Sequence, residues 1–257
     1  MTTETKNWTT EFFDDLFAEH HLVRDDEKEL CETIAFFENK LHLKPQDRIF
    51  DQCCGVGSLG IALARKGYRI TGMDLIPSYI ERARRDAKDV KELCVFEAGD
   101  AHTYVAPVPC DAAINWWTSF GYTPDDAQNI RMLQCVSRSL KTGAWFTLDY
   151  MNAPQRLKGF GNKEYSISET TKKDCTITWE SRLDKANHMI VKKWSYTGAD
   201  GKKIEKQGGG AKLYERSDLE KMFSACGFDN IQFYGSVAGE LLSDSSPRCI
   251  VVARKGN

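Results

Sequence analysis

The sequence predicts an α/β fold, with one sheet of seven mostly parallel strands, helices on both of its faces and an inserted antiparallel β subdomain. Short apolar segments alternate with helical segments between residues 48 and 150, which implies right-handed crossovers and a parallel sheet. The apolar period becomes two after Pro154, as in antiparallel strands. With 257 residues, of which 41% are hydrophobic, the chain buries a substantial core without disulfide support.

The elements of the first part of the chain follow from periodicity. Residues 11–40 predict two amphipathic helices, because large apolar side chains recur at helical spacing: Phe12, Phe13, Leu16 and Phe17, then Leu30, Ile34, Phe37 and Leu41. Buried strands are expected at residues 48–51, 69–74, 93–98, 112–115 and 144–150. Helices are expected between them at residues 58–66, 77–87 and 124–140.

The remaining part begins with the segment "CTITWESRLDKANHMIVKKWSYTGADGKKI". Its alternation and its turn signals "DKAN" and "GADG" predict two or three antiparallel strands at the edge or rim of the sheet. A helix is expected over residues 217–226, with Ser217 and Glu220 as a capping box and Gly227 as its stop. Two last strands are expected at residues 231–234 and 249–253.

Charge and composition restrict the partners of this chain. Lys and Arg total 35 against 37 acidic residues, a formal charge of -2, so no basic field favours nucleic acid or an anionic membrane. No run of about 20 apolar residues predicts a membrane span, and the first residues lack the pattern of a signal peptide. The nine cysteines are scattered, without C-x-x-C pairs. We therefore expect a cytoplasmic protein with reduced thiols, no metal site and a small-molecule partner.

The stretch "DQCCGVGSLG" holds the pattern G-x-G-x-x-G between the first strand and the first helix. Such a loop presents backbone N–H groups and a helix end to a ligand, and a nicotinamide dinucleotide is one candidate. Asp51, however, stands four residues before Gly55, where its carboxylate would repel a pyrophosphate. The same carboxylate suits a cofactor that carries an ammonium group and a cationic sulfur.

Two further acidic residues end the next two strands. Asp74 ends the second strand 19 residues after Gly55, a position that suits contact with both ribose hydroxyls of an adenosine. Asp100 follows the third strand in "EAGDAHTY" and suits the adenine amino group. Asp74 as a helix cap and Asp100 as a turn residue are the structural alternatives. Three acids at one strand edge favour a ligand, because open α/β sheets bind ligands there.

From about Trp8 to Lys255 the chain resembles class I S-adenosylmethionine-dependent methyltransferases, especially the small-molecule branch. The stretches that carry the resemblance are "FDQCCGVGSLGIALARKGYRITGMD", "FEAGDA", "NWWTSFGYTPDD", "LKTGAWFTLDYMN", "KLYERSDLEKMFSACGF" and "SPRCIVVARK". One position departs from the family: Cys53 stands where a glycine is usual. Glycine there allows a close approach of the backbone to the methionyl group, so Cys53 either points away or changes that contact.

The resemblance implies a Rossmann-like domain, a cofactor and a division of the chain. The implied parts are an N-terminal helical lid (1–44), a cofactor-binding domain (45–155 and 213–257) and an antiparallel insertion (156–212) that covers the acceptor or forms a dimer contact. The cofactor is S-adenosyl-L-methionine, and the residues expected to bind it are Asp51, Cys53, Gly55, Gly57, Asp74, Leu75, Asp100, Ala101, Asn115 and Trp116.

The acceptor pocket is expected around "NWWTSFGYTP", after the fourth strand. Aromatic faces stabilise cations such as a sulfonium, although some of these rings are expected in the core. The residues expected to contact the acceptor are Trp8, Phe13, Trp117, Phe120, Tyr122, Asn152 and Tyr214. The motif lacks the prolines of the N-P-P-Y type found in enzymes that methylate nucleic-acid amino groups.

Catalysis is expected to be in-line methyl transfer to a nitrogen or oxygen of a small metabolite, with proximity as the main contribution. His20, His21 and Tyr150 are the candidate general bases, and an amine acceptor requires none. A structural role stays open for Asp149. Two other functions stay open: an NAD(P)-dependent oxidoreductase that uses "GVGSLG", and a S-adenosylmethionine-binding protein without turnover. Monomer and homodimer are both compatible with the sequence.

Overall fold

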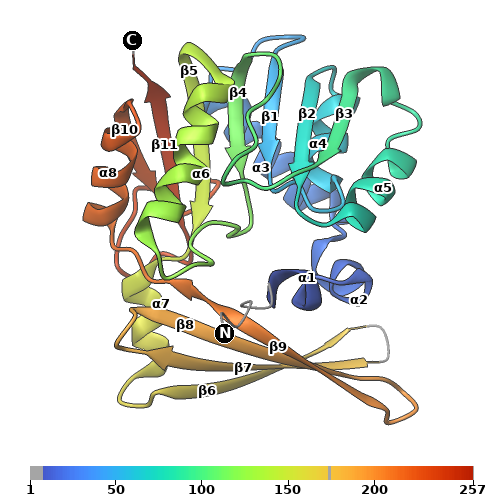
Figure 1. Cartoon of the computed structure of the whole chain (residues 1–257), viewed down its shortest axis with the longest axis vertical. Helices are drawn as coiled ribbons and strands as arrows, with labels where there is room; N and C mark the ends of the chain where they lie inside the picture. The colour runs from blue at the N-terminus through green and yellow to red at the C-terminus, as the bar shows by residue number, and fades with distance from the viewer. Residues whose placement is uncertain (1–7, 173–174, 257) are drawn as a thin grey trace, which may run out of the picture.

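The computed structural model describes residues 8–172 and 175–256, which form two sheets (Figure 1). The larger sheet has seven strands in the order β10-β11-β5-β4-β1-β2-β3. Its parallel strands are β1 (Arg48–Gln52), β2 (Arg69–Asp74), β3 (Cys94–Ala98), β4 (Cys110–Asn115) and β5 (Leu140–Tyr150). β11 (Cys249–Lys255) is antiparallel to both β5 and β10 (Phe228–Tyr234). The predicted Rossmann-like α/β fold is confirmed.

Helices cover both faces of this sheet. The helices are α3 (Glu27–Lys40), α4 (Ser58–Arg65), α5 (Pro77–Asp86), α6 (Asp126–Ser139) and α8 (Arg216–Ala225), with a 3-10 turn, η2, at Lys91–Leu93. Alternate strand residues face opposite sides, so Ile49 packs in a cluster with Phe37 of α3. Phe50, its neighbour, packs in the other cluster with Phe223 of α8. Two apolar layers therefore fix the sheet between the helices.

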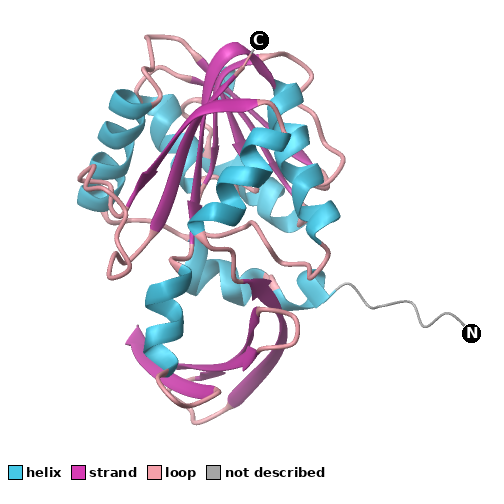
Figure 2. Cartoon of the chain, turned by 90° about the vertical axis from the view of Figure 1, so that its left-hand side faces the viewer, coloured by secondary structure: helices cyan, strands magenta, loops and turns pink. Residues whose placement is uncertain are grey.

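The second sheet is antiparallel and contains β6 (Tyr165–Lys172), β7 (Cys175–Asp184), β8 (Met189–Thr197) and β9 (Lys203–Lys212) in sequence order. Helix α7 (Ala153–Phe160) connects it to β5. Figures 1 and 2 show that it lies beyond the carboxyl ends of the parallel strands, as a separate layer. The segment 175–204, predicted as two or three antiparallel strands, forms β7, β8 and the start of β9. Two features were not predicted: β6, a largely exposed strand with little apolar alternation, and the separation of these strands into a sheet of their own.

The first predicted helix is also interrupted. The structure has α1 (Trp8–Phe12), α2 (Asp15–Phe17) and a π turn, η1 (Ala18–Leu22). The break occurs at Asp14, whose carboxylate accepts a hydrogen bond from the Phe17 N–H at 2.9 Å. The same side chain forms an ion pair with Lys206 of β9 at 2.6 Å. A capping carboxylate held by the second sheet therefore ends one helix and begins the next.

The predicted capping box of α8 is displaced toward the N-terminus. Glu215, not Ser217, is the N-cap, and its N–H donates to the Asp218 carboxylate at 3.0 Å. The sequence "YERSDLEKM" offers two overlapping capping patterns, and the helix begins at the earlier one.

Three consecutive glycines of β9 allow α1 to pack directly on the second sheet. A Cβ atom at Gly208 would lie 2.5 Å from the Phe12 ring, and one at Gly209 would lie 2.1 Å from the Trp8 ring. Phe12 also packs with Phe17 and with Trp194 of β8 in an apolar cluster. The glycine run "GGG" is therefore an attachment site for the N-terminal segment.

Gly209→Ala is expected to displace α1 and to lower the free energy of unfolding by about 2 kcal/mol, since extra atoms in a close-packed contact cost about 1–3 kcal/mol. Urea unfolding measures the change, and proteolysis near the N-terminus measures the displacement. Because Trp8→Ala removes the ring that clashes, the double variant is expected to lose less stability than the sum of the single variants. Strict additivity of the two would contradict this packing.

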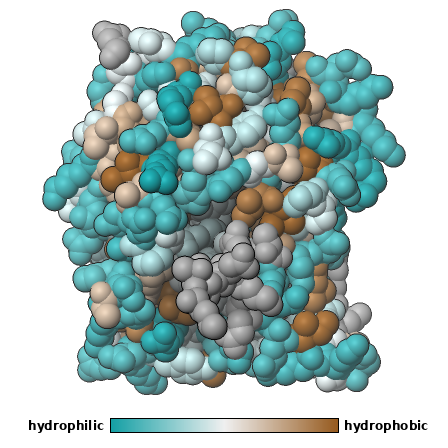
Figure 3. Space-filling model, viewed as in Figure 1, coloured by the Kyte–Doolittle hydropathy of each residue, from teal (hydrophilic) through white to brown (hydrophobic). Residues whose placement is uncertain are grey.

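The surface gives no further constraint on partners. The face seen in Figure 3 is mostly hydrophilic, with apolar side chains in small groups. Within the described ranges, every helix is too short or too polar to cross a bilayer.

Candidate active site

The glycine loop turns sharply between β1 and α4. Gly57 is the residue before α4 and has a φ of 78°, a left-handed conformation that glycine adopts without a Cβ penalty. A Cβ there would also lie 2.9 Å from Ala83 and 3.1 Å from Phe96. Gly55 has a φ of 56°. Both glycines are therefore required by the backbone. The loop is buried at both positions, and a Cβ at Gly55 would lie 3.4 Å from the Leu22 side chain of η1.

Asp74 connects this loop to the end of β2. Its Oδ2 accepts the Gly55 N–H at 2.9 Å and its Oδ1 accepts the Ile76 N–H at 3.0 Å. The side chain is buried, and burial raises its pKa against the effect of these backbone donors. Each carboxylate oxygen can accept more than one hydrogen bond. Asp74 can therefore accept from ribose hydroxyls, as predicted, while it also accepts from the two backbone N–H groups.

Asp51 lies deeper than the sequence suggested. It is 3% exposed, and its Oδ2 would lie 3.2 Å from a Cβ at Gly60, so the carboxyl group is under the loop on the α4 side of the sheet. Within the described residues Oδ2 has no hydrogen-bond partner. Burial, with a smaller effect of the nearby Asp74, raises its pKa to about 8. A buried acceptor without a donor is a position where a ligand ammonium group fits.

Asn115 at the end of β4 belongs to a buried amide network that the sequence reasoning missed. Its Nδ2 donates to Gln52 Oε1 at 3.0 Å, and Gln52 Nε2 donates to the carbonyls of Met132 at 3.2 Å and Ala101 at 3.4 Å. Asn115 Oδ1 has no partner among the described residues. Gln52 could have been noticed as a polar residue inside a strand next to Asp51, although nothing in the sequence places it against Asn115.

The residues predicted near the adenosine lie at the ends of β2 and β3. Asp100 is half exposed and accepts from the backbone and the ring of His102, at 2.9 Å and 2.7 Å. Ala101 is buried, while Leu75 is 37% exposed. Asp100 therefore forms the turn that was its structural alternative, and the edge beside it stays accessible.

The loop after β4 is held by a buried ion pair. Trp117 and Thr118 both have a φ of 61°, a strained conformation for residues with a Cβ. The Trp117 N–H donates to Asp149 Oδ2 at 3.0 Å, and Asp149 is paired with Arg248. Asp149 therefore has the structural role left open for it. The Arg24 guanidinium lies 4.5 Å from the centre of the Trp117 ring, so this indole is covered by the N-terminal segment.

Two of the aromatic residues predicted for the site, Trp116 and Phe120, make internal contacts. Trp116 is 3% exposed and packs edge-on against Phe37 of α3, so its side chain is in the core. Phe120 is completely buried between Tyr150 and Tyr214. We expected some of these aromatic rings in the core and others in the pocket. The structure has the side chains of Trp116 and Phe120 in the core.

Three polar side chains predicted for the site, which lie at the end of β5 or after it, also form hydrogen bonds within the protein. The Tyr150 hydroxyl donates to the Lys212 carbonyl, and burial raises its pKa well above the ordinary value. Asn152 Nδ2 donates to the carbonyls of Ser243 at 2.9 Å and Ser246 at 2.8 Å. The Tyr214 hydroxyl donates to Asp126 at 2.6 Å. In this geometry these side chains hold loops in place, and the Tyr150 hydroxyl donates its proton to a backbone carbonyl.

The structure brings together Trp8, Phe13 and Tyr122 from two distant segments. The Tyr122 ring centre lies 5.7 Å from that of Trp8 and 5.6 Å from that of Phe13. His21 packs against the rings of Phe17 and Trp179, at 4.7 Å and 5.0 Å, and His20 lies 4.9 Å from the Tyr196 ring. An aromatic wall therefore joins α1, the loop after β4 and the second sheet.

Cys53 occupies a backbone conformation suited to glycine, with a φ of 62°. Cys53→Gly is expected to raise the free energy of unfolding by about 1 kcal/mol, the cost of a left-handed conformation for a residue with a Cβ. Cys53→Ala is the matched control, because it removes the sulfur and keeps the Cβ. Urea unfolding of both variants measures the difference, and a glycine variant less stable than the alanine variant would show that packing of the sulfur outweighs the strain.

Comparison with known proteins agrees with this geometry. Residues 49–143 match the family described as "Methyltransferase domain". An uncharacterized RNA methyltransferase of Enterococcus faecalis is 33% identical over 85 residues, which are 33% of this chain and 17% of that protein. One of Streptococcus pneumoniae serotype 4 is 34% identical over 85 residues, with the same coverage. The match is thus confined to a part of these curated relatives, of which it spans less than a fifth.

Solved structures match over nearly the whole chain. The CcbJ methyltransferase from Streptomyces caelestis has a TM-score of 0.82 at 13% identity, over 96% of this chain and 99% of that one. A S-adenosylmethionine-dependent methyltransferase from Clostridium acetobutylicum has a TM-score of 0.79 at 16% identity, over 94% and 97%. CalS10 from Micromonospora echinaspora, an amino pentose methyltransferase, has a TM-score of 0.67 at 17% identity, over 93% and 94%.

The fold of the chain is that of these solved methyltransferases, and residues 49–143 match the family of methyltransferase domains. The resemblance to methyltransferases inferred from the motifs is confirmed by these matches.

Proposed function

We propose that the protein is a methyltransferase that uses S-adenosyl-L-methionine and methylates a nitrogen or oxygen of a small metabolite. The observation that carries this proposal is the arrangement at one edge of the sheet. A glycine loop held by Asp74 lies there beside two buried oxygen atoms, Asp51 Oδ2 and Asn115 Oδ1, for which the described residues supply no donor. An ammonium group and ribose hydroxyls supply the missing donors. The pyrophosphate of a dinucleotide supplies none and would face two carboxylates.

The cofactor fits the residues predicted to hold it. Asp51 and the Asn115 side-chain oxygen would accept hydrogen bonds from the ammonium group of the methionyl part. Asp74 would contact the ribose. The adenine edge would lie beside Asp100, Ala101 and Leu75. The backbone of the glycine loop, under the segment from α1 to η1, would lie along the cofactor. When bound, S-adenosylmethionine supplies an electrophilic methyl group: the acceptor atom bonds to the methyl carbon while the carbon–sulfur bond breaks.

The residues of the chain contribute alignment and exclusion of water. The segment from α1 to η1 crosses the loop: the Ser58 hydroxyl donates to the Leu22 carbonyl at 3.2 Å, and the Tyr79 hydroxyl donates to the Asp14 carbonyl at 2.9 Å. We assign this segment the role of a lid. The aromatic wall of Trp8, Phe13 and Tyr122 would then bound the acceptor, with His20 and His21 as the remaining candidate bases.

A small acceptor is favoured over RNA by charge and by the second sheet. The chain carries no excess of basic residues, with a net charge of -2, whereas RNA binding relies on positive surface. The match to RNA methyltransferases covers a third of this chain. An amino pentose methyltransferase and a sugar N-methyltransferase share its architecture over nearly the whole length.

Two measurements test the proposed function. Calorimetry is expected to show binding of S-adenosylhomocysteine and no binding of NADH. Incubation with methyl-labelled cofactor and a metabolite extract is expected to label a small molecule. Tight binding without labelled product would indicate a binding protein without turnover, NADH binding would favour the oxidoreductase, and label in an RNase-sensitive fraction would overturn the small-molecule acceptor.

Cofactor binding is expected to release a proton from Asp51. With a pKa raised to about 8, its carboxyl group is mostly protonated at neutral pH in the absence of a cation. An adjacent ammonium group favours the carboxylate and lowers this pKa, so affinity is expected to increase from about pH 6 to about pH 8. Calorimetry in two buffers with different ionisation enthalpies measures the proton, and Asp51→Asn is expected to abolish its release.

The same group gives the ligand-free protein a defined pH dependence of stability. Between about pH 4 and about pH 8 the folded state retains a proton that the unfolded state loses, so the free energy of unfolding decreases as pH rises through this window. Asp51→Asn is expected to remove that decrease. A wild-type stability that increases over the same range would contradict the protonated state of Asp51.

A further inference from the structure

A cavity of about 310 Å³ lies between α7 and the concave side of the second sheet. Its lining includes inward-facing residues of three adjacent strands, among them Ser166 and Ser168 of β6, Trp179 and Ser181 of β7, and Lys192 of β8. Met151, the residue after β5, lines its other side. The cavity therefore begins at the carboxyl edge of the main sheet, one strand from Asn115 and two strands from Asp51, or about 10 Å.

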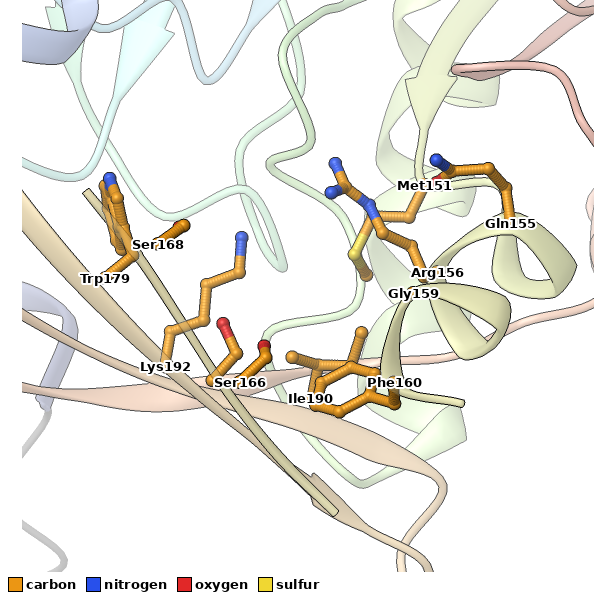
Figure 4. Close-up of a pocket in the computed structure, with 11 residues that line it drawn as sticks. Met151, Gln155, Arg156, Gly159, Phe160, Ser166, Ser168, Trp179, Ile190 and Lys192 are labelled. Atoms are coloured by element: carbon orange, nitrogen blue, oxygen red, sulfur yellow. The ribbon is translucent and has the colours of Figure 1, made fainter. Parts of the chain in front are cut away.

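Two cationic side chains project into this cavity from opposite sides, Arg156 from α7 and Lys192 from β8 (Figure 4). Neither forms an ion pair with a carboxylate in the described part of the chain, and the lining contains no aspartate or glutamate there. Lys192 lies 5.6 Å from the centre of the Trp179 ring. Burial, with a smaller effect of Arg156, lowers its pKa to about 8. The folded protein therefore holds two mutually repelling cations together without a counter-charge.

Lys193 shows that this arrangement is specific to one face of β8. It is the next residue and therefore points to the opposite face, where it pairs with Glu205 at 3.6 Å and Glu180 at 4.0 Å. Both lysines are half-buried, but Lys193 has two acidic partners, whereas Lys192 has an arginine and three serine hydroxyls around the same cavity. Lysine and arginine side chains without a carboxylate partner among the described residues suit the binding of an anion.

We propose that this cavity binds the anionic group of the methyl acceptor, a phosphate or a carboxylate, with Lys192 and Arg156 as its cationic partners and the serines as hydrogen-bond donors. This inference rests on the proposed methyl transfer. The reacting nitrogen or oxygen of the acceptor would lie toward β4 and the aromatic wall, so the acceptor is an extended molecule with its nucleophile and its anion well separated. Arg156 and Lys192 are specificity residues here and take no part in the bond changes.

The first test measures binding of anions to the full chain loaded with S-adenosylhomocysteine. Pyrophosphate and citrate are the probes for phosphate and carboxylate, at constant ionic strength. At least one of the two anions is expected to raise the melting temperature of the wild type and of Lys193→Met. Its affinity is expected to be about tenfold or more lower for Lys192→Met and for Arg156→Met, because each change removes a charge-assisted contact. In the absence of an anion, Lys192→Met is expected to have a higher melting temperature than the wild type, because the change removes one of two repelling cations. Such a result excludes misfolding as the cause of its lower affinity for the anion.

The second test identifies the charge of the labelled product. Methyl label transferred into a metabolite extract is expected in a product that binds an anion-exchange resin, and Lys192→Met is expected to form about tenfold less of it than Lys193→Met. Release of the label from the resin by phosphatase indicates a phosphate, and resistance indicates a carboxylate. A neutral or cationic product, equal labelling by the two lysine variants, or no effect of either probe on the wild type would overturn the proposal. Failure of the proposed function itself is recognised separately, by absence of S-adenosylhomocysteine binding and of any labelled product.

Discussion

Asp74→Ala is expected to reduce the affinity for S-adenosylhomocysteine by about 100-fold or more. The change removes the acceptor of two backbone N–H groups, of Gly55 and Ile76, and each donor left unpaired in a buried site costs about 1–3 kcal/mol. The loop then loses its connection to β2, and the predicted ribose contact is lost as well. Calorimetric titration with S-adenosylhomocysteine measures the affinity, and urea unfolding measures the accompanying loss of stability.

Asp111→Ala is the matched control for Asp74. Asp111 also accepts a backbone N–H across strands, that of Arg48 at 3.0 Å, but it lies at the start of β4, at the opposite edge of the sheet. Its removal is expected to cost stability and to leave the affinity for S-adenosylhomocysteine unchanged. Equal loss of affinity in both variants, or full binding by Asp74→Ala, would refute the assignment of the cofactor to the edge that holds the glycine loop.

The sequence predicted this edge because the chemistry and the secondary structure agree locally. Asp51, Gly55 and Asp74 stand at the ends of clearly apolar strands, and parallel strands place their carboxyl ends together. The depth of Asp51 could not be predicted in the same way. Which side of the sheet a strand residue faces depends on how α4 packs, and here Gly60 makes room for the carboxyl group under the loop.

Contacts between distant segments explain most other differences from the sequence predictions. Phe120 and Tyr214 are separated by more than 90 positions, yet their rings lie 5.8 Å apart in one core cluster. No local pattern distinguishes such a ring from one that lines a pocket. The cavity with Lys192 was missed for the same reason, since the sequence shows only two neighbouring lysines on a strand, and their different environments depend on α7 and β6.

Arg248→Met is expected to lower the free energy of unfolding by about 3–5 kcal/mol, the cost of leaving a buried charge without its partner. Asp149 is 2% exposed, and Arg248 Nε donates to its Oδ1 at 2.7 Å. The same guanidinium lies 4.9 Å from the centre of the Trp116 ring. Urea unfolding measures the loss. Arg254→Met in β11 is the control, because Arg254 is exposed and donates to the Gly143 carbonyl, and a change within about 0.5 kcal/mol is expected there.

The ion pair between Asp149 and Arg248 also fixes the conformation of the loop after β4, which carries Tyr122 of the aromatic wall. Asp149 receives the Trp117 N–H, and its own carbonyl receives the Thr118 N–H at 3.3 Å, so it holds both strained residues in place. Replacement of both partners by apolar residues, Asp149→Leu with Arg248→Met, removes the unpaired charge and is expected to recover part of the stability. It does not restore the loop, because the Trp117 N–H still lacks an acceptor. We therefore expect the double variant to bind S-adenosylhomocysteine but to form less methylated product, whereas product formation that recovers together with stability would show that the loop conformation does not depend on Asp149.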